Sequence, residues 1–155
     1  LLWRIHALHH LPDELYALMS PVNGPAMVLL IRALPFAALV LLGFPPTVLF
    51  TYALLDAWFG LVSHTGVDTH NPWLSRVWVT PEVHRLHHSA HPGDAGNLGL
   101  LFTLWDRVFG TFVAPRPTDV PRVGWPDGDP PPRSWVRALL LVRSEPHRGR
   151  LSDRP

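Results

Sequence analysis

Residues 26–62, AMVLLIRALPFAALVLLGFPPTVLFTYALLDAWFGLV, decide the fold expected for this chain. The adjacent prolines Pro45 and Pro46 divide them into two apolar runs, 26–44 and 47–62. As helices that rise about 1.5 Å per residue, the runs are roughly 25–28 Å long, slightly short of a bilayer core of about 30 Å. The pattern therefore predicts a helical hairpin.

This hairpin has two interpretations: the buried core of a soluble protein, or a hairpin embedded in a membrane. Arg32 and Pro35 weaken the first run as a membrane span, because a lone arginine in lipid costs several kcal/mol. An ion pair with Asp56 across the hairpin, or a position facing the protein interior, would remove this cost. We favour the membrane hairpin. Two passes return the chain to the face from which it started, so histidines before and after the hairpin could build one site on the same side.

Two histidine motifs with the same spacing flank the hairpin, His6-Ala-Leu-His9-His10 and His84-Arg-Leu-His87-His88. Offsets of three and four residues place the three rings of each motif on one helical face. We predict a helix over residues 2–18 with an interruption near Pro12, after which Asp13 is a plausible cap. A second helix is predicted over 81–91, with Thr80 as its cap and Pro81 at its first position.

The composition also indicates a membrane or a very apolar partner. Of the 155 residues, 47% are hydrophobic and 16% are charged, against about 25% charged residues in typical soluble domains. The net charge of +1 is too small to indicate a nucleic acid as partner. Because the chain has no cysteine, disulfides, thiolate-ligated zinc and cysteine nucleophiles are excluded.

The histidine motifs favour a metal site, since imidazole binds iron, zinc, copper and nickel. The three rings of a motif either share one metal ion or divide between two. A zinc peptidase would need a glutamate between its helical histidines, and here Ala7-Leu8 and Arg85-Leu86 occupy those places. Glu-x-x-His pairs, which bind iron in soluble helical bundles, are also absent from the sequence. A histidine-dominated site beside an apolar hairpin suits redox chemistry on a lipid.

Several segments together resemble the fatty acid hydroxylase and sterol desaturase superfamily of membrane di-iron enzymes. Residues 2–10, LWRIHALHH, resemble its second histidine box, and residues 84–89, HRLHHS, its third. His64-Thr-Gly-Val-Asp68 resembles the isolated histidine between those boxes. Asn97-Leu-Gly99 with residues 105–111, WDRVFGT, resembles the segment that closes the catalytic domain.

The resemblance implies an all-α integral membrane protein with a transmembrane hairpin between two histidine-box helices. The catalytic region is expected over residues 1–113, followed by an irregular Pro- and Arg-rich tail, 114–155, with a short helix near 135–143. The implied ligands of two iron ions are His6, His9, His10, His64, His84, His87 and His88. Candidates for hydrogen bonds that orient these ligands are Asp68, His91 and Asn97.

The implied reaction is an O2-dependent hydroxylation or desaturation of a lipid of the sterol or fatty acyl type. The metal site is expected on the cytoplasmic side of the membrane. The sequence carries no GxGxxG nucleotide fingerprint, so electrons would come from a separate donor, a cytochrome b5-like protein or a ferredoxin with its reductase. We expect no nucleic acid partner.

Two departures from the family pattern lead to alternatives. The first histidine box, HxxxH, would precede the Leu-Trp-Arg stretch at residues 2–4, so we expect a member that is truncated at its N-terminus. Gly24 stands where the family often has a histidine. One alternative is a non-catalytic or degenerate member with an incomplete metal site. The other is a soluble, histidine-rich protein that binds zinc or nickel.

Overall fold

The computed structural model describes residues 2–69, 71–94, 96–115 and 121–127. The elements in these ranges are helical, and β-pairing in the same ranges is limited to two isolated β-bridges. The order of the elements is α1 (Leu2–His6), η1 (Ala7–His10), η2 (Ala17–Met19), α2 (Pro25–Val28), η3 (Leu29–Ala33), α3 (Leu34–Leu41), α4 (Pro46–Ser63), η4 (Leu74–Arg76), α5 (Pro81–His87), η5 (Pro92–Asp94) and α6 (Leu104–Phe109). The predicted short helix at 135–143 lies outside the described residues.

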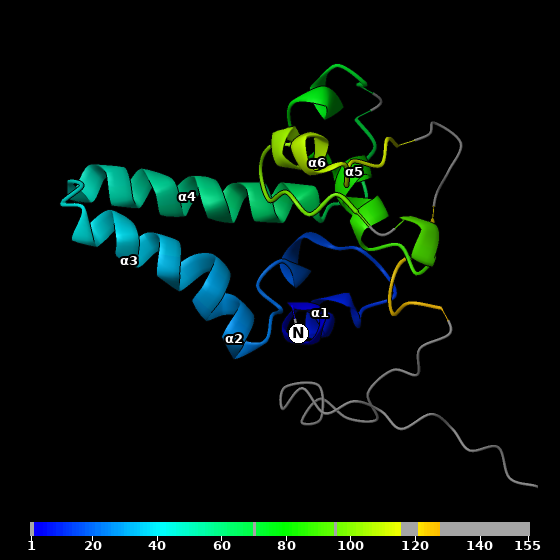
Figure 1. Ribbon diagram of the computed structural model, residues 1–155, viewed down its shortest axis with the longest axis horizontal. Helices are drawn as coiled ribbons and strands as arrows, with labels where there is room; N and C mark the ends of the chain where they lie inside the picture. Colours follow the sequence, from blue (N-terminus) through cyan, green and yellow to red (C-terminus); the bar gives the residue numbers. More distant parts are fainter. Residues whose placement is uncertain (1, 70, 95, 116–120, 128–155) are drawn as a thin grey trace, which may run out of the picture.

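The predicted hairpin is present, formed by the continuous run α2–η3–α3 and by α4 (Figure 1). Gly43 adopts a left-handed φ of 77° in the turn between them, a conformation that favours glycine. The π-helical turn η3 ends two residues before Pro35, which lacks an N–H and would crowd the carbonyl of residue 31 in a regular α-helix. Helix α4 is long and apolar enough to cross a membrane, whereas the apolar run Pro25–Leu41 is shorter.

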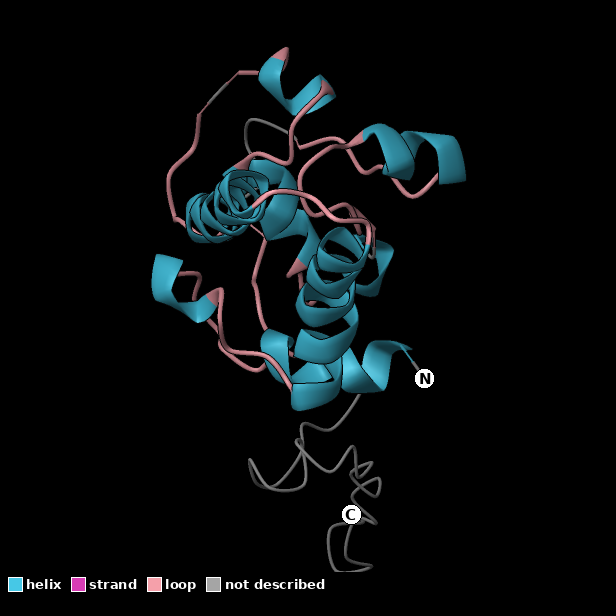
Figure 2. Ribbon diagram, turned by 90° about the vertical axis from the view of Figure 1, so that its left-hand side faces the viewer, coloured by secondary structure: helices cyan, strands magenta, loops and turns pink. Residues whose placement is uncertain are grey.

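The hairpin is not a buried core. It projects from the rest of the molecule (Figure 1), and Figure 2 shows the molecule from the side of the hairpin tip. Within α4, Ser63 is the buried residue. Large apolar side chains that it exposes include Leu29, Leu34, Leu41, Leu42, Phe50 and Trp58. Monomeric soluble proteins rarely expose contiguous apolar surface on this scale. The interpretation of the hairpin as the core of a soluble protein is therefore wrong.

Of the two arrangements considered for Arg32, the structure shows the ion pair with Asp56, which connects η3 to α4 across the hairpin. Each charge therefore has a partner of opposite sign between the two apolar arms of the hairpin, where an unpaired charge would be costly.

Both histidine segments are shorter than predicted. The predicted interruption near Pro12 is confirmed, because the first helical segment ends with η1 at His10 and Pro12 has no N–H to continue it. The segment does not continue as a regular helix to residue 18. Asp13 caps no helix, since the next element is the short turn η2. Helix α5 begins with Pro81 at its first turn, as predicted, but it ends at His87, and the Thr80 side chain makes no capping hydrogen bond.

Part of the predicted tail packs against the second histidine segment. Val123 is buried and pairs with Ser89 in a β-bridge, and the N–H of Gly124 donates to the carbonyl oxygen of His88 at 3.0 Å. The ring of Trp125 lies 5.8 Å from that of Trp3, measured between centroids. Residues 121–127 thus contact both the second histidine segment and the N-terminal helix α1.

Candidate metal centre

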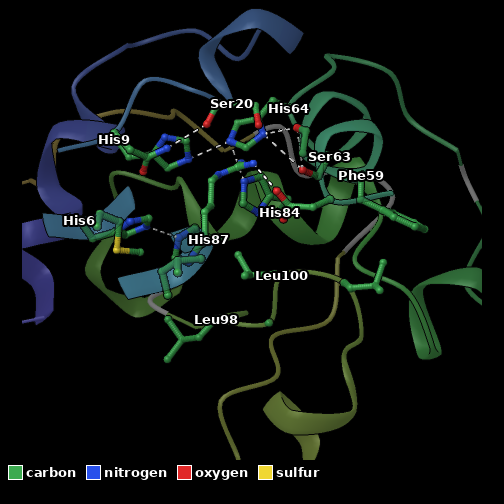
Figure 3. A pocket seen from close by; sticks show the side chains of 18 of the residues that line it. His6, His9, Ser20, Phe59, Ser63, His64, His84, His87, Leu98 and Leu100 are labelled. Carbon is green, nitrogen blue, oxygen red and sulfur yellow. Dashed lines mark hydrogen bonds and ion pairs between the residues drawn. The ribbon is translucent and has the colours of Figure 1, made fainter. Parts of the chain in front are cut away.

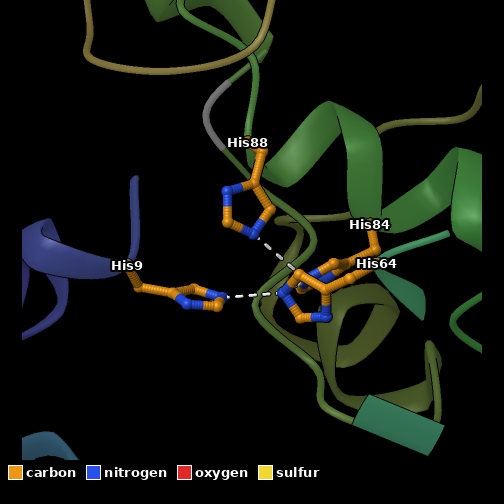
Figure 4. Close-up of side chains that lie close together, drawn as sticks. All are labelled: His9, His64, His84 and His88. Atoms are coloured by element: carbon orange, nitrogen blue, oxygen red, sulfur yellow. Dashed lines mark hydrogen bonds between the residues drawn. The ribbon is translucent and has the colours of Figure 1, made fainter. Parts of the chain in front are cut away.

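Seven histidines converge at the place where α1, η1, α5 and the end of α4 meet. They form two groups, one of His9, His64, His84 and His88 and another of His6, His10 and His87. Within each group the potential ligand atoms all lie within 4.8 Å of one another. The histidines come from three segments that are far apart in the sequence (Figures 3 and 4).

Each HxxHH motif divides its rings between the two groups in a complementary way. His84 and His88, four residues apart, share a group with His9 of the other motif. His6 and His10, also four residues apart, share the second group with His87. On a helix, positions i and i+4 differ by about 40°, whereas i+3 lies about 60° to the other side. In α5 the spacing therefore directs His87 away from His84 and His88, whereas the first motif runs from α1 into the 3₁₀ segment η1.

The Nε2 atoms of neighbouring rings lie at the separation expected of ligands to one ion. In the group of four, His9 and His64 are 2.8 Å apart, His64 and His84 3.0 Å, and His84 and His88 3.1 Å. In the group of three, His87 lies 2.9 Å from His6 and 3.3 Å from His10. Metal–imidazole bonds of about 2.0–2.1 Å place neighbouring ligand nitrogens roughly 3 Å apart.

Backbone carbonyl groups hold three of the rings by their other nitrogen. The Nδ1–H of His9 donates to Val22 at 2.9 Å, that of His64 to Gly60 at 2.6 Å, and that of His87 to Gly96 at 3.0 Å. A neutral ring that donates from Nδ1 presents an Nε2 lone pair. His9 and His64 therefore face each other with two acceptors, an arrangement that a cation between them would stabilise. The residues present fit a metal ion.

Burial keeps these imidazoles in the form that binds metal. Desolvation, reinforced by neighbouring histidines, lowers the pKa of His6 to about 3 and that of His9 to about 4. The same causes lower the pKa of His10, His84 and His88 well below 6.5. Desolvation also lowers the pKa of His64 and His87, partly offset by their hydrogen bonds to backbone carbonyls. The cluster is neutral near pH 7, and neutral imidazole is the ligand.

The three residues predicted to support the ligands lie in different places. Asp68 forms an ion pair with the buried Arg85 at 2.7 Å. His91 is exposed, and its ring accepts a hydrogen bond from the N–H of Gly93, so it lies outside the cluster. Asn97 is buried and bonds to Val83 and Val113 through its side chain, so its hydrogen bonds go to backbone groups.

Asp106 supports the loop that holds His87. Its buried carboxylate accepts hydrogen bonds from the N–H groups of Leu98 and Gly99, at 2.7 and 2.9 Å, and from the hydroxyl of Thr111 at 2.7 Å. This loop begins at Gly96, whose carbonyl binds the His87 ring. The sequence signal was the family resemblance of Asn97-Leu-Gly99 and of WDRVFGT, because these two stretches contain Asp106 and the residues that donate hydrogen bonds to it.

Gly24, which stands where the family that the sequence resembles often has a histidine, lies at the start of α2. A Cβ atom at Gly24 would lie 3.3 Å from the carbonyl oxygen of Ile5 in α1. This position serves the close approach of α2 to the first histidine helix.

A cavity of about 750 Å³ connects the histidines with the inner faces of the hairpin (Figure 3). His6, His9, His64, His84 and His87 lie on its wall. Apolar side chains of both hairpin helices and of the Asp106-supported loop line the remainder, among them Met27, Ile31, Leu55, Phe59, Leu98 and Leu100. The cavity therefore offers an apolar space that ends at both groups of histidines.

Comparison with known proteins agrees with this geometry. The pattern that describes the fatty acid hydroxylase family matches residues 1–111, which include all seven converging histidines. The chain belongs to the fatty acid hydroxylase family. This result confirms the resemblance noted in the sequence.

Curated proteins similar to this chain have names that refer to several lipids. The ornithine lipid hydroxylase OlsE of Rhizobium tropici is 35% identical over 76% of this chain and 36% of its own length. The alkylglycerol monooxygenase of Caenorhabditis elegans is 32% identical over 79% of this chain and 24% of its own length. A cholesterol 25-hydroxylase-like protein of Danio rerio is 27% identical over 69% of this chain and 43% of its own length.

The chain thus spans about a quarter to two fifths of the curated relatives' lengths. No solved structure matches it significantly.

Proposed function

We propose that this chain carries the histidine cluster of a membrane-bound di-iron oxidoreductase that uses O2 to hydroxylate or desaturate a lipid. The observation that carries the proposal is the convergence of seven Nε2 atoms in two groups at the end of one apolar cavity. Family membership supports it, since the related proteins carry names of lipid hydroxylases and monooxygenases. A zinc hydrolase is disfavoured because neither motif has a glutamate between its histidines.

In this proposal the two groups of histidines hold one iron ion each. Bound iron would supply the activation of O2 and the oxidation of an unactivated C–H bond. The chain's own part is to fix the ligands. The carbonyl groups of Val22, Gly60 and Gly96 keep the Nε2 atoms of His9, His64 and His87 unprotonated and aimed inward. The low pKa values of the buried rings keep protons from competing with the metal near pH 7.

The cavity would position the lipid. Its apolar walls exclude water from the part of the lipid that reacts, and they hold one carbon near the histidines. Hydroxylation would add one oxygen atom to a held carbon, whereas desaturation would remove one hydrogen atom from each of two adjacent carbons. A sterol and a fatty acyl chain are the two substrate types proposed, since both present an extended apolar body to such a cavity.

The hairpin would anchor the protein in the membrane and admit the lipid. Its exposed apolar side chains would contact acyl chains, and the cavity between its helices would allow a lipid to reach the histidines without entering water. We place the histidine cluster on the cytoplasmic side, where an electron donor can approach. That donor is proposed to be a cytochrome b5-like protein or a ferredoxin with its reductase.

The test is turnover of a lipid with isotopically heavy O2. The chain would be purified in detergent, loaded anaerobically with ferrous iron, and supplied with ferredoxin, its reductase and a membrane lipid extract. A lipid that gains one heavy oxygen atom would indicate hydroxylation, and a lipid that loses two hydrogen atoms would indicate desaturation. We expect His87→Ala to abolish product and the exposed control His91→Ala to retain it. A chain that binds iron fully and forms no product would instead be a non-catalytic member.

A further inference from the structure

A charged pair lies inside the cavity, among its apolar walls. Arg32 of η3 and Asp56 of α4 form an ion pair across the hairpin, and both line the cavity. Their side chains are 35% and 26% exposed, so the pair faces the cavity and is not sealed inside a core. Two apolar side chains would join the helices at a lower desolvation cost. The two charges are explained if the molecule that enters the cavity itself carries charges that they bind.

The cavity-facing side of α4 shows how far this pair lies from the histidines. Tyr52, Asp56, Gly60 and His64 follow one another at intervals of four residues, and all line the cavity. A Cβ atom at Gly60 would lie 3.5 Å from Nη2 of Arg32, so the guanidinium lies beside Gly60. Along α4, the pair is therefore one to two helical turns from His64, about 6–12 Å at 1.5 Å per residue.

The pair has hydrogen-bonding capacity left for a ligand. Nη1 of Arg32 donates to Oδ2 of Asp56, and within the described ranges the two side chains form no other hydrogen bond. A guanidinium has five N–H donors, and a carboxylate has two acceptor oxygens. Unused donors and an unused carboxylate oxygen remain on the two residues. The pair has no net charge, and it offers a place for an anion next to a place for a cation.

The geometry points to Arg32 and Asp56 as a binding site for the headgroup of a zwitterionic lipid. The anionic part of the headgroup accepts hydrogen bonds from Arg32, while its ammonium donates to Asp56. This inference rests on the proposed function, in which a lipid occupies the cavity. The lipid's acyl chain extends from the headgroup site along α4 toward the histidines. The carbon that reaches the histidines then lies within about 6–12 Å of the headgroup charges, and not at the far end of the acyl chain.

The experiment measures lipid retention by native mass spectrometry of the intact, metal-free chain in detergent. Three probes carry identical acyl chains: phosphatidylethanolamine, which is zwitterionic, phosphatidylglycerol, which is anionic, and diacylglycerol, which is uncharged. We expect phosphatidylethanolamine to be retained about tenfold more than either other probe, the effect of roughly one charge-assisted hydrogen bond. Equal retention of the three, or stronger retention of phosphatidylglycerol or diacylglycerol, would overturn the inference.

A charge swap separates recognition from a purely structural ion pair. Arg32→Asp combined with Asp56→Arg keeps two opposite charges between the helices but exchanges the places of anion and cation. We expect this double variant to fold, as judged by circular dichroism, and to lose the tenfold preference. The Leu54→Ala control changes an exposed side chain of α4 outside the cavity and should keep the preference. A folded swap variant with an unchanged preference would overturn the inference.

A second pair of variants covers the case in which the swapped protein does not fold. Arg32→Gln and Asp56→Asn are uncharged and close in size to the native side chains, and each should reduce the preference several-fold. Wild-type preference in a folded form of both variants would contradict a headgroup site. These measurements use metal-free protein, so they test the headgroup site without testing the proposed function. The proposed function is overturned by other results, when the histidines bind no iron or the iron-loaded chain forms no product.

Discussion

The Nε2 atoms of His9 and His64 lie 2.8 Å apart, although the Nδ1–H of each ring already donates to a backbone carbonyl. Two lone pairs therefore face each other across a contact between residues 55 positions apart. Two neutral imidazoles in this tautomer repel, whereas a metal cation between them turns the same contact into shared coordination. The arrangement is therefore one that a shared metal cation would stabilise.

We predict that iron loading falls group by group. His64→Ala removes a ligand from the group of four, and His87→Ala removes one from the group of three. Each variant should bind about one iron fewer than the wild-type chain when metal content is measured after anaerobic reconstitution. The exposed His91→Ala serves as the matched control and should bind as much iron as wild type. An equal loss in His91→Ala, or no loss in the other two, would contradict the assignment of the groups.

The metal-free chain should lose stability on mild acidification. The pKa of His6 is lowered to about 3 and that of His9 to about 4, whereas an unfolded histidine has a pKa near 6.5. Below pH 6.5 the unfolded chain binds protons that the folded chain excludes, so the free energy of unfolding falls as the pH falls. Between pH 7 and pH 5 one such ring contributes a loss of about 2 kcal/mol.

Denaturant unfolding followed by tryptophan fluorescence checks this prediction. Stability above pH 7 should be nearly constant, because the rings are neutral in both states there. Bound iron should shift the acid transition to lower pH, since the metal occupies the lone pairs that protons would take. An unfolding free energy that stays level from pH 7 to pH 5 would contradict the prediction.

Removing the Asp106 carboxylate should destabilise the loop that holds His87. Asp106→Ala leaves the N–H groups of Leu98 and Gly99 without their partner, and we expect a loss of about 2–3 kcal/mol. Asp106→Asn retains an acceptor oxygen and should cost less. The exposed control Asp13→Ala should change stability by less than about 0.5 kcal/mol. Wild-type stability and iron content in Asp106→Ala would show that the loop needs no such support.

The absence of cysteine makes the membrane topology directly testable. Leu42→Cys places one thiol at the exposed tip of the hairpin, and Glu14→Cys places one near the histidines. If the hairpin spans the bilayer, a maleimide that cannot cross membranes should label the two variants from opposite sides of sealed vesicles. Labelling of both from the same side would show that the hairpin enters the membrane without crossing it.

The local sequence predicted much of the architecture. Pro45 and Pro46 cannot continue a helix, so they placed the end of the hairpin, and the apolar runs beside them predicted its two arms. The pairing of Arg32 with Asp56 followed from the cost of a lone charge among apolar residues. The end of the first histidine segment followed from Pro12, whereas the end of α5 at His87 was less predictable, because a short helix often ends where its tertiary contacts end.

The sequence by itself determined the chemistry: two helical turns that each present three imidazoles, an isolated histidine after the hairpin, and an apolar hairpin between them. Helical spacing acts over one or two turns, so it set which rings of a motif share a face. Only the tertiary structure decided that His9 joins His84 and His88, that backbone carbonyls fix the tautomers, and that Asp106 supports the loop of His87. These contacts join residues far apart in the chain, and the packing of the helices brings them together.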